Sequence, residues 1–231
     1  MNYLKWLGTE LRSINTAGGI MLAFIVGVQL AFYLSAPITG LSTITLVATL
    51  VGSACTVYMM IGKPINGWLG LISAIGFIYI NWSAGHFASV LDQLVFITLI
   101  DIPLILTWKT WGHKVKNGVK FLSKKGWILT LASMLILWYP VMLIYSQLGD
   151  TNPLWDSIVL IIGATASLYV FKGYGDSYSL WLLSDGVNIM LWLSAAVIGY
   201  SASSLPMLLT MAFYLATALY GRFFSIWRGK K

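Results

Sequence analysis

The sequence has very few charged residues. Asp, Glu, Lys and Arg make up only 9% of its 231 residues, whereas 58% are hydrophobic and the mean hydropathy is +0.83. A soluble protein of this size needs a polar surface, and so few charges could not supply one. The composition therefore excludes a soluble domain and predicts that most of the surface faces lipid.

Cysteine and histidine are also scarce. The chain has one cysteine, Cys55, which excludes an intramolecular disulfide and is expected to be a small packing residue. His86 and His113 fall in separate predicted loops, isolated and without metal-ligand spacing. Since no Ser/His/Asp or Cys/His set can be assembled, we expect no metal site, no cofactor and no enzymatic activity. The first 12 residues resemble mature chain, not a cleaved signal peptide.

Long apolar runs are what the sequence has instead. About 20 apolar residues cross roughly 30 Å of hydrocarbon, and unbroken runs favour helices over the alternating strands of a barrel. This criterion predicts an all-α polytopic membrane protein with eight spans. They cover residues 16–34, 41–61, 67–82, 87–108, 127–148, 154–171, 178–199 and 205–224.

The basic residues are confined to alternate loops. All 14 Lys and Arg residues lie before the first span, after the second, fourth and sixth, or at and beyond the end of the eighth, and the other loops contain none. Cytoplasmic loops retain Lys and Arg, so both termini are predicted to be cytoplasmic. The net charge of +7 fits this orientation and anionic lipid, without a nucleic-acid partner. Tryptophans near span ends, such as Trp82, Trp111 and Trp227, are expected to be interfacial anchors.

An internal repeat is suggested by a shift of 113 residues, which superposes spans two to four on spans six to eight. Trp68 then coincides with Trp181 and Tyr79 with Trp192. Any two triplets of membrane helices look alike at this level, but here both triplets begin on the same side, as parallel repeats do. We expect an extra transmembrane helix in residues 1–36, repeats in 37–111 and 150–231, and a basic loop with a linker helix in 112–149.

Asp101 and Asp185 are the clearest acidic residues within predicted spans, and no Lys or Arg falls in the interior of any span. Ionisable groups in hydrocarbon are costly and usually face the bundle interior, where they mark a pathway. Asp101 precedes Pro103, and Asp185 is about two turns from a helix end. Each is therefore either a functional group or a partly hydrated structural one.

The seventh span carries aromatic and polar residues on one helical face. Trp181, Asp185, Asn188 and Trp192 follow spacings of four, three and four. Such a face can stack on a flat ring, attract positive charge and hydrogen-bond hydroxyl or amide groups. The alternative is a packing face whose polar groups bond neighbouring helices.

The other candidates are weaker. Gln93 shares a helical face with Asp101, Asn81 closes the third span, and Trp68 and Tyr79 are the repeat mates of the two tryptophans. Interfacial hydration or packing would explain these residues equally well. The predicted substrate-binding set is Trp181, Asp185, Asn188, Trp192, Trp68, Tyr79, Asn81, Gln93 and Asp101.

The segment GYGDSYSLWLLSD, residues 173–185, resembles the most recognisable stretch of the PnuC nicotinamide riboside transporters. Trp181 matches the second Trp of their motif and Asp185 the polar position that follows, whereas Tyr178 stands where a first Trp is commoner. The number of spans, the basic linker and the repeat extend the resemblance over nearly the whole chain. It implies a SWEET-like fold with an added N-terminal helix, a homotrimer, and facilitated diffusion sustained by cytoplasmic phosphorylation of the product.

Other functions remain open. Relatives of this family carry other vitamins and nucleosides, and thiamin, which is also flat and cationic, fits the aromatic and acidic face nearly as well. A second hypothesis is proton coupling through Asp101 or Asp185. A third is a membrane scaffold whose basic loop, residues 114–125, recruits an acidic partner, although the chain lacks sizeable soluble domains. In every case we expect a multi-pass protein of the bacterial inner membrane.

Overall fold

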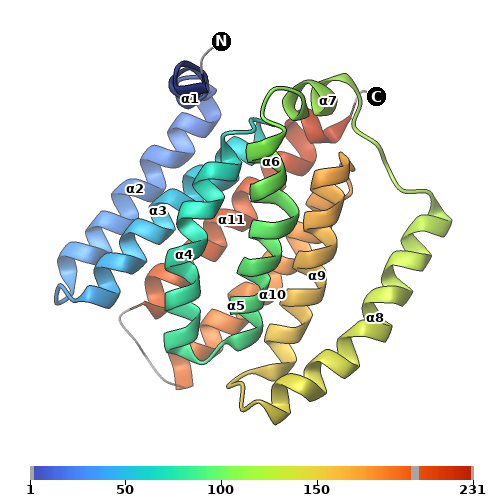
Figure 1. Ribbon diagram of the computed structural model, residues 1–231. Helices are drawn as coiled ribbons and strands as arrows, with labels where there is room; N and C mark the ends of the chain where they lie inside the picture. The colour runs from blue at the N-terminus through green and yellow to red at the C-terminus, as the bar shows by residue number, and fades with distance from the viewer. Residues whose placement is uncertain (1–2, 199–202, 230–231) are drawn as a thin grey trace.

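The computed structural model describes residues 3–198 and 203–229, and these ranges are almost entirely helical (Figure 1). The helices are α1 (Tyr3–Leu11), α2 (Thr16–Ser35), α3 (Gly40–Met60), α4 (Asn66–Ala84), α5 (Phe87–Phe96), η1 (Ile97–Asp101), α6 (Ile102–Leu106), α7 (Trp111–Asn117), α8 (Lys124–Gln147), α9 (Pro153–Lys172), α10 (Ser177–Ile198), α11 (Ser204–Phe224) and η2 (Ile226–Arg228).

Eight helical segments are long and apolar enough to cross a membrane. They are α2, α3, α4, the combined α5, η1 and α6, and then α8, α9, α10 and α11, each of 19 to 24 residues. At a rise of about 1.5 Å per residue, such lengths match the hydrocarbon thickness. The predicted all-α class and its eight spans are confirmed, with the ends shifted by at most three residues. The predicted end at residue 199 lies outside the described residues.

The fourth span is interrupted at its middle. After α5 the chain forms a π-helical turn, η1, in which the Ile102 N–H donates to the carbonyl of Ile97, five residues earlier. Pro103 follows at the start of α6, where a residue without an N–H is tolerated. A π turn accommodates one extra residue and changes the direction of the side chains around it. The irregular turn therefore coincides with Asp101, the acid that the sequence places in this span.

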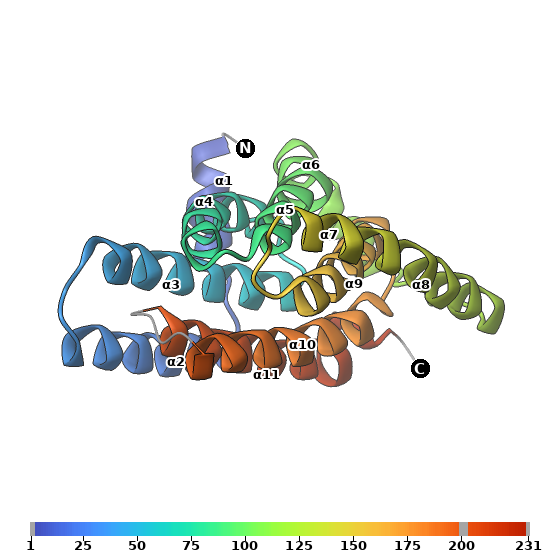
Figure 2. The same cartoon turned by 90° about the horizontal axis from the view of Figure 1, so that it is seen from below.

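Six of the spans contribute side chains to the centre of the bundle. Helices α2 and α8 lie at opposite sides of it (Figures 1 and 2). Helix α3 packs against α2, α4 and α11, while α9 packs against α5, α8 and α10. Helix α10 lies between α9 and α11, with extensive contacts to both. The face of α10 that carries Trp181 and Asp185 thus belongs to the centre of the bundle.

Both ends of the chain lie at the same end of the bundle, together with α1 and α7 (Figure 1). We call this the basic end, because every described Lys and Arg lies in α1, in a turn or short helix at this end, or at a helix terminus that reaches it. At the opposite end, here the distal end, the described turns contain none. The charge asymmetry that the sequence predicts is therefore a feature of the fold.

Two of the predicted interfacial tryptophans are buried inside the protein. Trp111 is 3% exposed and Trp227 is 0% exposed, and they pack with Tyr178 in a core under the basic end. The Trp227 indole also donates to the carbonyl of Met59 at 2.9 Å. Their expected role as lipid anchors is wrong, because α7 and η2 fold back over the bundle. Trp82, by contrast, is 65% exposed near the distal end, as expected of an anchor.

Candidate substrate-binding site

A cavity occupies the centre of the bundle. Side chains from α3, α4, α5, η1, α9, α10 and α11 line it, and the space between them, including the part that is open to solvent, is about 1050 Å³. Six of the eight spans therefore contribute to one shared central site.

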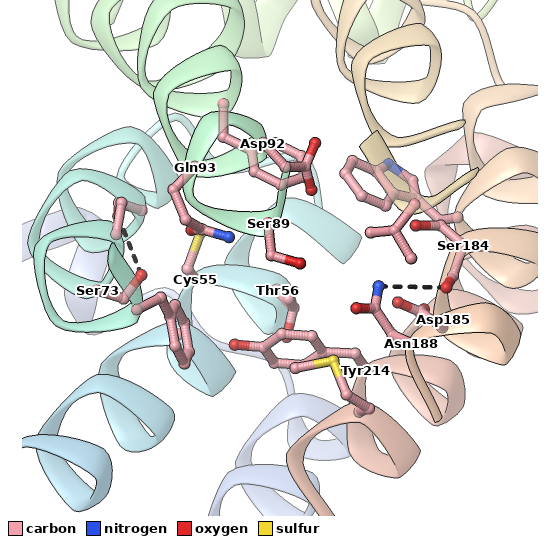
Figure 3. A pocket seen from close by; sticks show the side chains of 18 of the residues that line it. Cys55, Thr56, Ser73, Ser89, Asp92, Gln93, Ser184, Asp185, Asn188 and Tyr214 are labelled. Atoms are coloured by element: carbon pink, nitrogen blue, oxygen red, sulfur yellow. Dashed lines mark hydrogen bonds between the residues drawn. The ribbon is translucent and has the colours of Figure 1, made fainter. Parts of the chain in front are cut away.

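Most of the residues that the sequence predicts for the site line this one cavity. Figure 3 shows Asp185 and Asn188 of α10 on one side of the pocket, with Gln93 and Asp92 of α5 across from them. The predicted residues that the structure brings together are Asn81, Gln93, Asp101, Trp181, Asp185, Asn188 and Trp192.

Trp68 and Tyr79 lie elsewhere, which corrects their expected place as walls opposite the two α10 tryptophans. The Trp68 indole donates to the hydroxyl of Tyr3 and so ties α4 to the N-terminal helix. Tyr79 is 51% exposed on the outer surface of α4. The face of α4 that lines the cavity carries Ser73, Phe77 and Asn81, which are buried.

Trp181 is the aromatic wall of the cavity. Its ring stacks on Phe96 of α5, with centroids 5.2 Å apart and an interplanar angle of 22°. Its indole nitrogen is buried and has no hydrogen-bond partner among the described residues. About two turns further along α10, the Asn188 amide donates to the Ser184 carbonyl at 3.2 Å. Trp181 therefore offers a flat apolar surface and a free donor.

The lining is acidic. Asp92, Asp101 and Asp185 are 4%, 3% and 6% exposed, and no Lys or Arg occurs among the lining residues described. One oxygen of Asp101 and one of Asp92 lack a hydrogen-bond partner within the described part of the chain. Buried carboxylates usually have a cation or several donors beside them. The cavity is therefore suited to a ligand that brings positive charge or hydrogen-bond donors.

Trp192 has a different setting from Trp181. It is 1% exposed and packs in a core with Phe77, Leu191 and Met207. Its ring meets the His86 ring edge to face, with centroids 5.3 Å apart. It lines the central cavity and also a second cavity at the distal end. Trp192 thus lies between two cavities, whereas the sequence predicts a second stacking surface.

His86 is paired, and the expectation that it is isolated is wrong. Its Nδ1 lies 3.0 Å from Asp156 Oδ2, and both side chains are almost fully buried. Ser89 donates to the other oxygen of the same carboxylate. Both groups meet the carboxylate directly, so this is not the chain of hydrogen bonds from hydroxyl to imidazole to carboxylate that a hydrolase uses. Among the described residues no group of metal-ligating side chains large enough for a metal site occurs.

Sequence reasoning missed several lining residues. Phe96 lies three residues after Gln93 and could have been found from helical spacing. The same holds for Met207, Met211 and Tyr214, which form one face of α11. Cys55, expected to be a packing residue, also lines the cavity, and its Sγ lies 3.3 Å from the Asn66 carbonyl.

Eight apolar spans, six of which surround a central cavity with polar and aromatic walls, have the architecture of a multi-pass membrane transporter. Comparison with known proteins gives the family. The family described as nicotinamide mononucleotide transporter matches residues 42–228, which is most of the chain. The chain therefore belongs to this family, that of the PnuC transporters.

Individual relatives agree with this assignment. The nicotinamide riboside transporter PnuC of Neisseria mucosa is 23% identical over 208 residues, covering 87% of this chain and 78% of that protein. The protein of the same name from Haemophilus influenzae is 22% identical over 209 residues, covering 87% and 86%. A crystal structure of the vitamin B3 transporter PnuC superposes with a TM-score of 0.82 at 22% identity, covering 98% of this chain and 97% of the other. The chain thus has the same fold as that structure.

Proposed function

We propose that this protein takes up nicotinamide riboside, a vitamin B3 precursor, by facilitated diffusion with alternating access. Net uptake is then sustained by phosphorylation of the product in the cytoplasm. The family and the names of the two relatives support the substrate class. The observation that carries the proposal is the chemistry of the cavity, where three buried carboxyl groups and an aromatic wall occur without a described Lys or Arg in the lining.

The proposed pose follows from these groups. Nicotinamide riboside has a flat cationic ring, a carboxamide and a ribose. The ring stacks on Trp181, where a cation over an indole is worth about 2 kcal/mol when water is excluded. Asp185 lies one turn along the same face and offsets the ring charge, and Asn188 bonds the carboxamide. Gln93 and Ser89, which approach from α5 (Figure 3), bond the ribose hydroxyls.

The proposed architecture is SWEET-like, with two parallel three-helix repeats, α3 to α6 and α9 to α11, joined by α8, and with α2 as the extra N-terminal helix. Helix packing supports this arrangement. The first helix of each repeat packs against the last helix of the other, α3 on α11 and α9 on α5. Such an exchange is expected for two units related by an axis through the centre. Alternating access then consists of rocking of the two repeats about the cavity.

We further propose a homotrimer in the bacterial inner membrane, with both termini in the cytoplasm. The basic end supports the orientation, because cytoplasmic segments retain Lys and Arg. The distal end then faces the outside. The trimer rests on the resemblance to the PnuC family.

The decisive experiment is binding of nicotinamide riboside to the purified protein and its Trp181→Ala variant, measured by calorimetry. Loss of about 2 kcal/mol of stacking weakens binding roughly thirtyfold. Trp82→Ala is the matched control, because this indole is exposed near the distal end and does not line the cavity. The control is expected to bind like the wild type. Equal affinity of Trp181→Ala and wild type would refute the site.

Substrate choice within the class is tested with Asp185→Asn and a ligand panel. Thiamin, or another vitamin or nucleoside, is the alternative substrate, and riboflavin and deoxynucleosides complete the panel. If Asp185 offsets ring charge, the variant loses about tenfold or more in affinity for nicotinamide riboside. It loses little for the reduced form of that molecule, whose ring is uncharged. An equal loss for both forms would show that charge is not what Asp185 recognises.

Proton coupling is the other alternative to facilitated diffusion. If uptake into liposomes does not change when a pH gradient is imposed, proton coupling is eliminated.

A further inference from the structure

The central cavity and a second cavity at the distal end share Trp192 as a lining residue. The distal cavity is lined by His86, Thr151 and Asn152 near the distal turns, by Ser83 and Ala84 at the end of α4, and by Trp192 itself. Trp192 also lines the central cavity, and it is 1% exposed. This indole therefore lies between the distal cavity and the central cavity. Trp192 is in the position of a gate.

The indole of Trp192 packs against a buried histidine, His86. The His86 ring packs edge to face against Trp192, and its Nδ1 lies 3.0 Å from Asp156 of α9. Ser89 holds the other Asp156 oxygen. His86 is 1% exposed, and its Nε2 has no hydrogen-bond partner within the described part of the chain. Nδ1 of the ring is thus hydrogen-bonded to a carboxylate, whereas Nε2, in the ring that packs on Trp192, has no hydrogen-bond partner among the described residues.

The surroundings of this pair are acidic. Asp92 faces it from α5 and Asp150 from the turn between α8 and α9, with Tyr145 of α8 packed nearby against Ala88. The described residues of α3, α4, α10 and α11 bring no Lys or Arg to this end. Histidine is the side chain that ordinarily changes charge between about pH 5 and pH 8.

We propose that His86 and Asp156 form a proton-binding site that controls the distal gate at Trp192. Protonation places a second N–H at Nε2, which has no acceptor while the gate is closed. A buried charged donor without an acceptor is costly. The protonated ring therefore favours an arrangement in which Nε2 reaches the water of the distal cavity, and Trp192 must move to allow it. Because the proton binds more tightly to the open state of the gate than to the closed state, protonation shifts the population toward the open state.

The consequence for transport rests on the proposed function, with the central cavity as the substrate path and the distal end outside. Acid on the outside opens the gate and speeds entry. Uptake of nicotinamide riboside into intact cells is expected to be at least about threefold faster at an outside pH of about 5.5 than at about 7.5. Binding of nicotinamide riboside to the purified protein at one fixed pH does not depend on the proton-controlled gate.

The test uses His86→Asn, because the asparagine amide can still donate to Asp156 but cannot titrate. Its uptake is expected to be independent of outside pH over this range. His113→Asn is the matched control, since this histidine is exposed on α7 at the basic end, and it keeps the wild-type profile. In Asp156→Asn the acceptor remains but its charge is lost, so the profile is expected to differ from that of the wild type. A flat wild-type profile, or a wild-type profile in His86→Asn, would overturn the proposal.

A substrate-free measurement separates this proposal from the proposed function. Cys55 is the single cysteine of the chain and lines the central cavity. A membrane-impermeant thiol reagent added to intact cells reaches it only through the distal gate. Wild-type protein is expected to be labelled faster than His86→Asn at low pH and equally fast at high pH, and comparison at each pH cancels the reactivity of the thiol. Equal rates throughout would refute the gate. If the gate responds but nicotinamide riboside fails to bind, the proposed substrate is wrong and the switch stands.

Discussion

Gly70 of α4 leaves room for the Asp101 carboxyl group. A Cβ built on Gly70 would lie 2.7 Å from Cγ of Asp101, closer than real Cβ atoms come to a neighbour. Gly163 of α9 has the same relation to Asp92, whose Oδ1 would lie 2.6 Å from an added Cβ. At the scale of single residues, two cavity acids therefore depend on the absence of a side chain in a facing helix.

We predict that Gly70→Ala displaces the Asp101 carboxyl group and lowers both stability and ligand affinity. Overpacking of this kind costs about 1–3 kcal/mol, so the thermal midpoint of the purified protein falls and binding weakens by about tenfold. Gly19→Ala is the control, because no atom lies within 4 Å of its added Cβ, and it is expected to leave both unchanged. Wild-type affinity in Gly70→Ala would mean that the position of Asp101 does not matter to the ligand.

At the scale of elements, the N-terminus of helix α5 is capped by a side chain from another part of the chain. Asp150, in the turn before α9, accepts the backbone N–H groups of Phe87 at 2.8 Å and Ala88 at 3.3 Å. These are orphan donors of the first turn of α5, which has no side-chain cap of its own. Burial raises the pKa of Asp150 above its ordinary value, and the nearby charge of Asp156 raises it further.

This raised pKa gives a prediction with a definite sign. The folded protein binds the Asp150 proton more tightly than the unfolded chain, so its stabilising contribution is complete below about pH 3.9 and is lost as pH rises through the folded pKa. In Asp150→Asn this dependence disappears, so the stability of the variant relative to wild type improves as pH rises from about 4. The measurement is the thermal midpoint in detergent across acid to neutral pH. Gln147→Ala, an exposed neutral neighbour, keeps the wild-type curve, and parallel curves for Asp150→Asn would contradict the assignment.

At the scale of the whole molecule, the separation of charge between the two ends decides how the protein sits in the membrane. Basic residues occupy one end, whereas Asp150, Asp156 and Asp92 lie toward the other. The cost of moving several Lys and Arg residues across the bilayer sets the orientation. In the orientation proposed above, the distal cavity is the entrance for substrate from outside.

Reporter fusions test this orientation. Green fluorescent protein fused after the C-terminus is expected to fluoresce, because it folds in the bacterial cytoplasm. Alkaline phosphatase inserted at Asn152, in the turn before α9, is expected to be active, because it requires the oxidising periplasm. The same enzyme inserted at Lys116, in α7, is expected to be inactive. The opposite set of activities would show that the topology is inverted.

Native mass spectrometry of the purified protein tests the proposed trimer.

The sequence by itself determined the class, the spans and the central stripe of α10. Hydropathy reports the cost of placing each segment in lipid, which depends on composition and length alone. The spacing of Trp181, Asp185 and Asn188 is local helical geometry, and the structure places all three at the cavity.

Only the tertiary structure decided what each helix face meets. Trp68 binds Tyr3, and Tyr79 points outward, because the rotation of α4 is set by its packing and not by its similarity to α10. His86 pairs with an aspartate 70 residues away in the chain, and η2 folds back to bury Trp227. No periodicity reports such contacts, because they depend on which helices become neighbours and on how each one is turned about its axis.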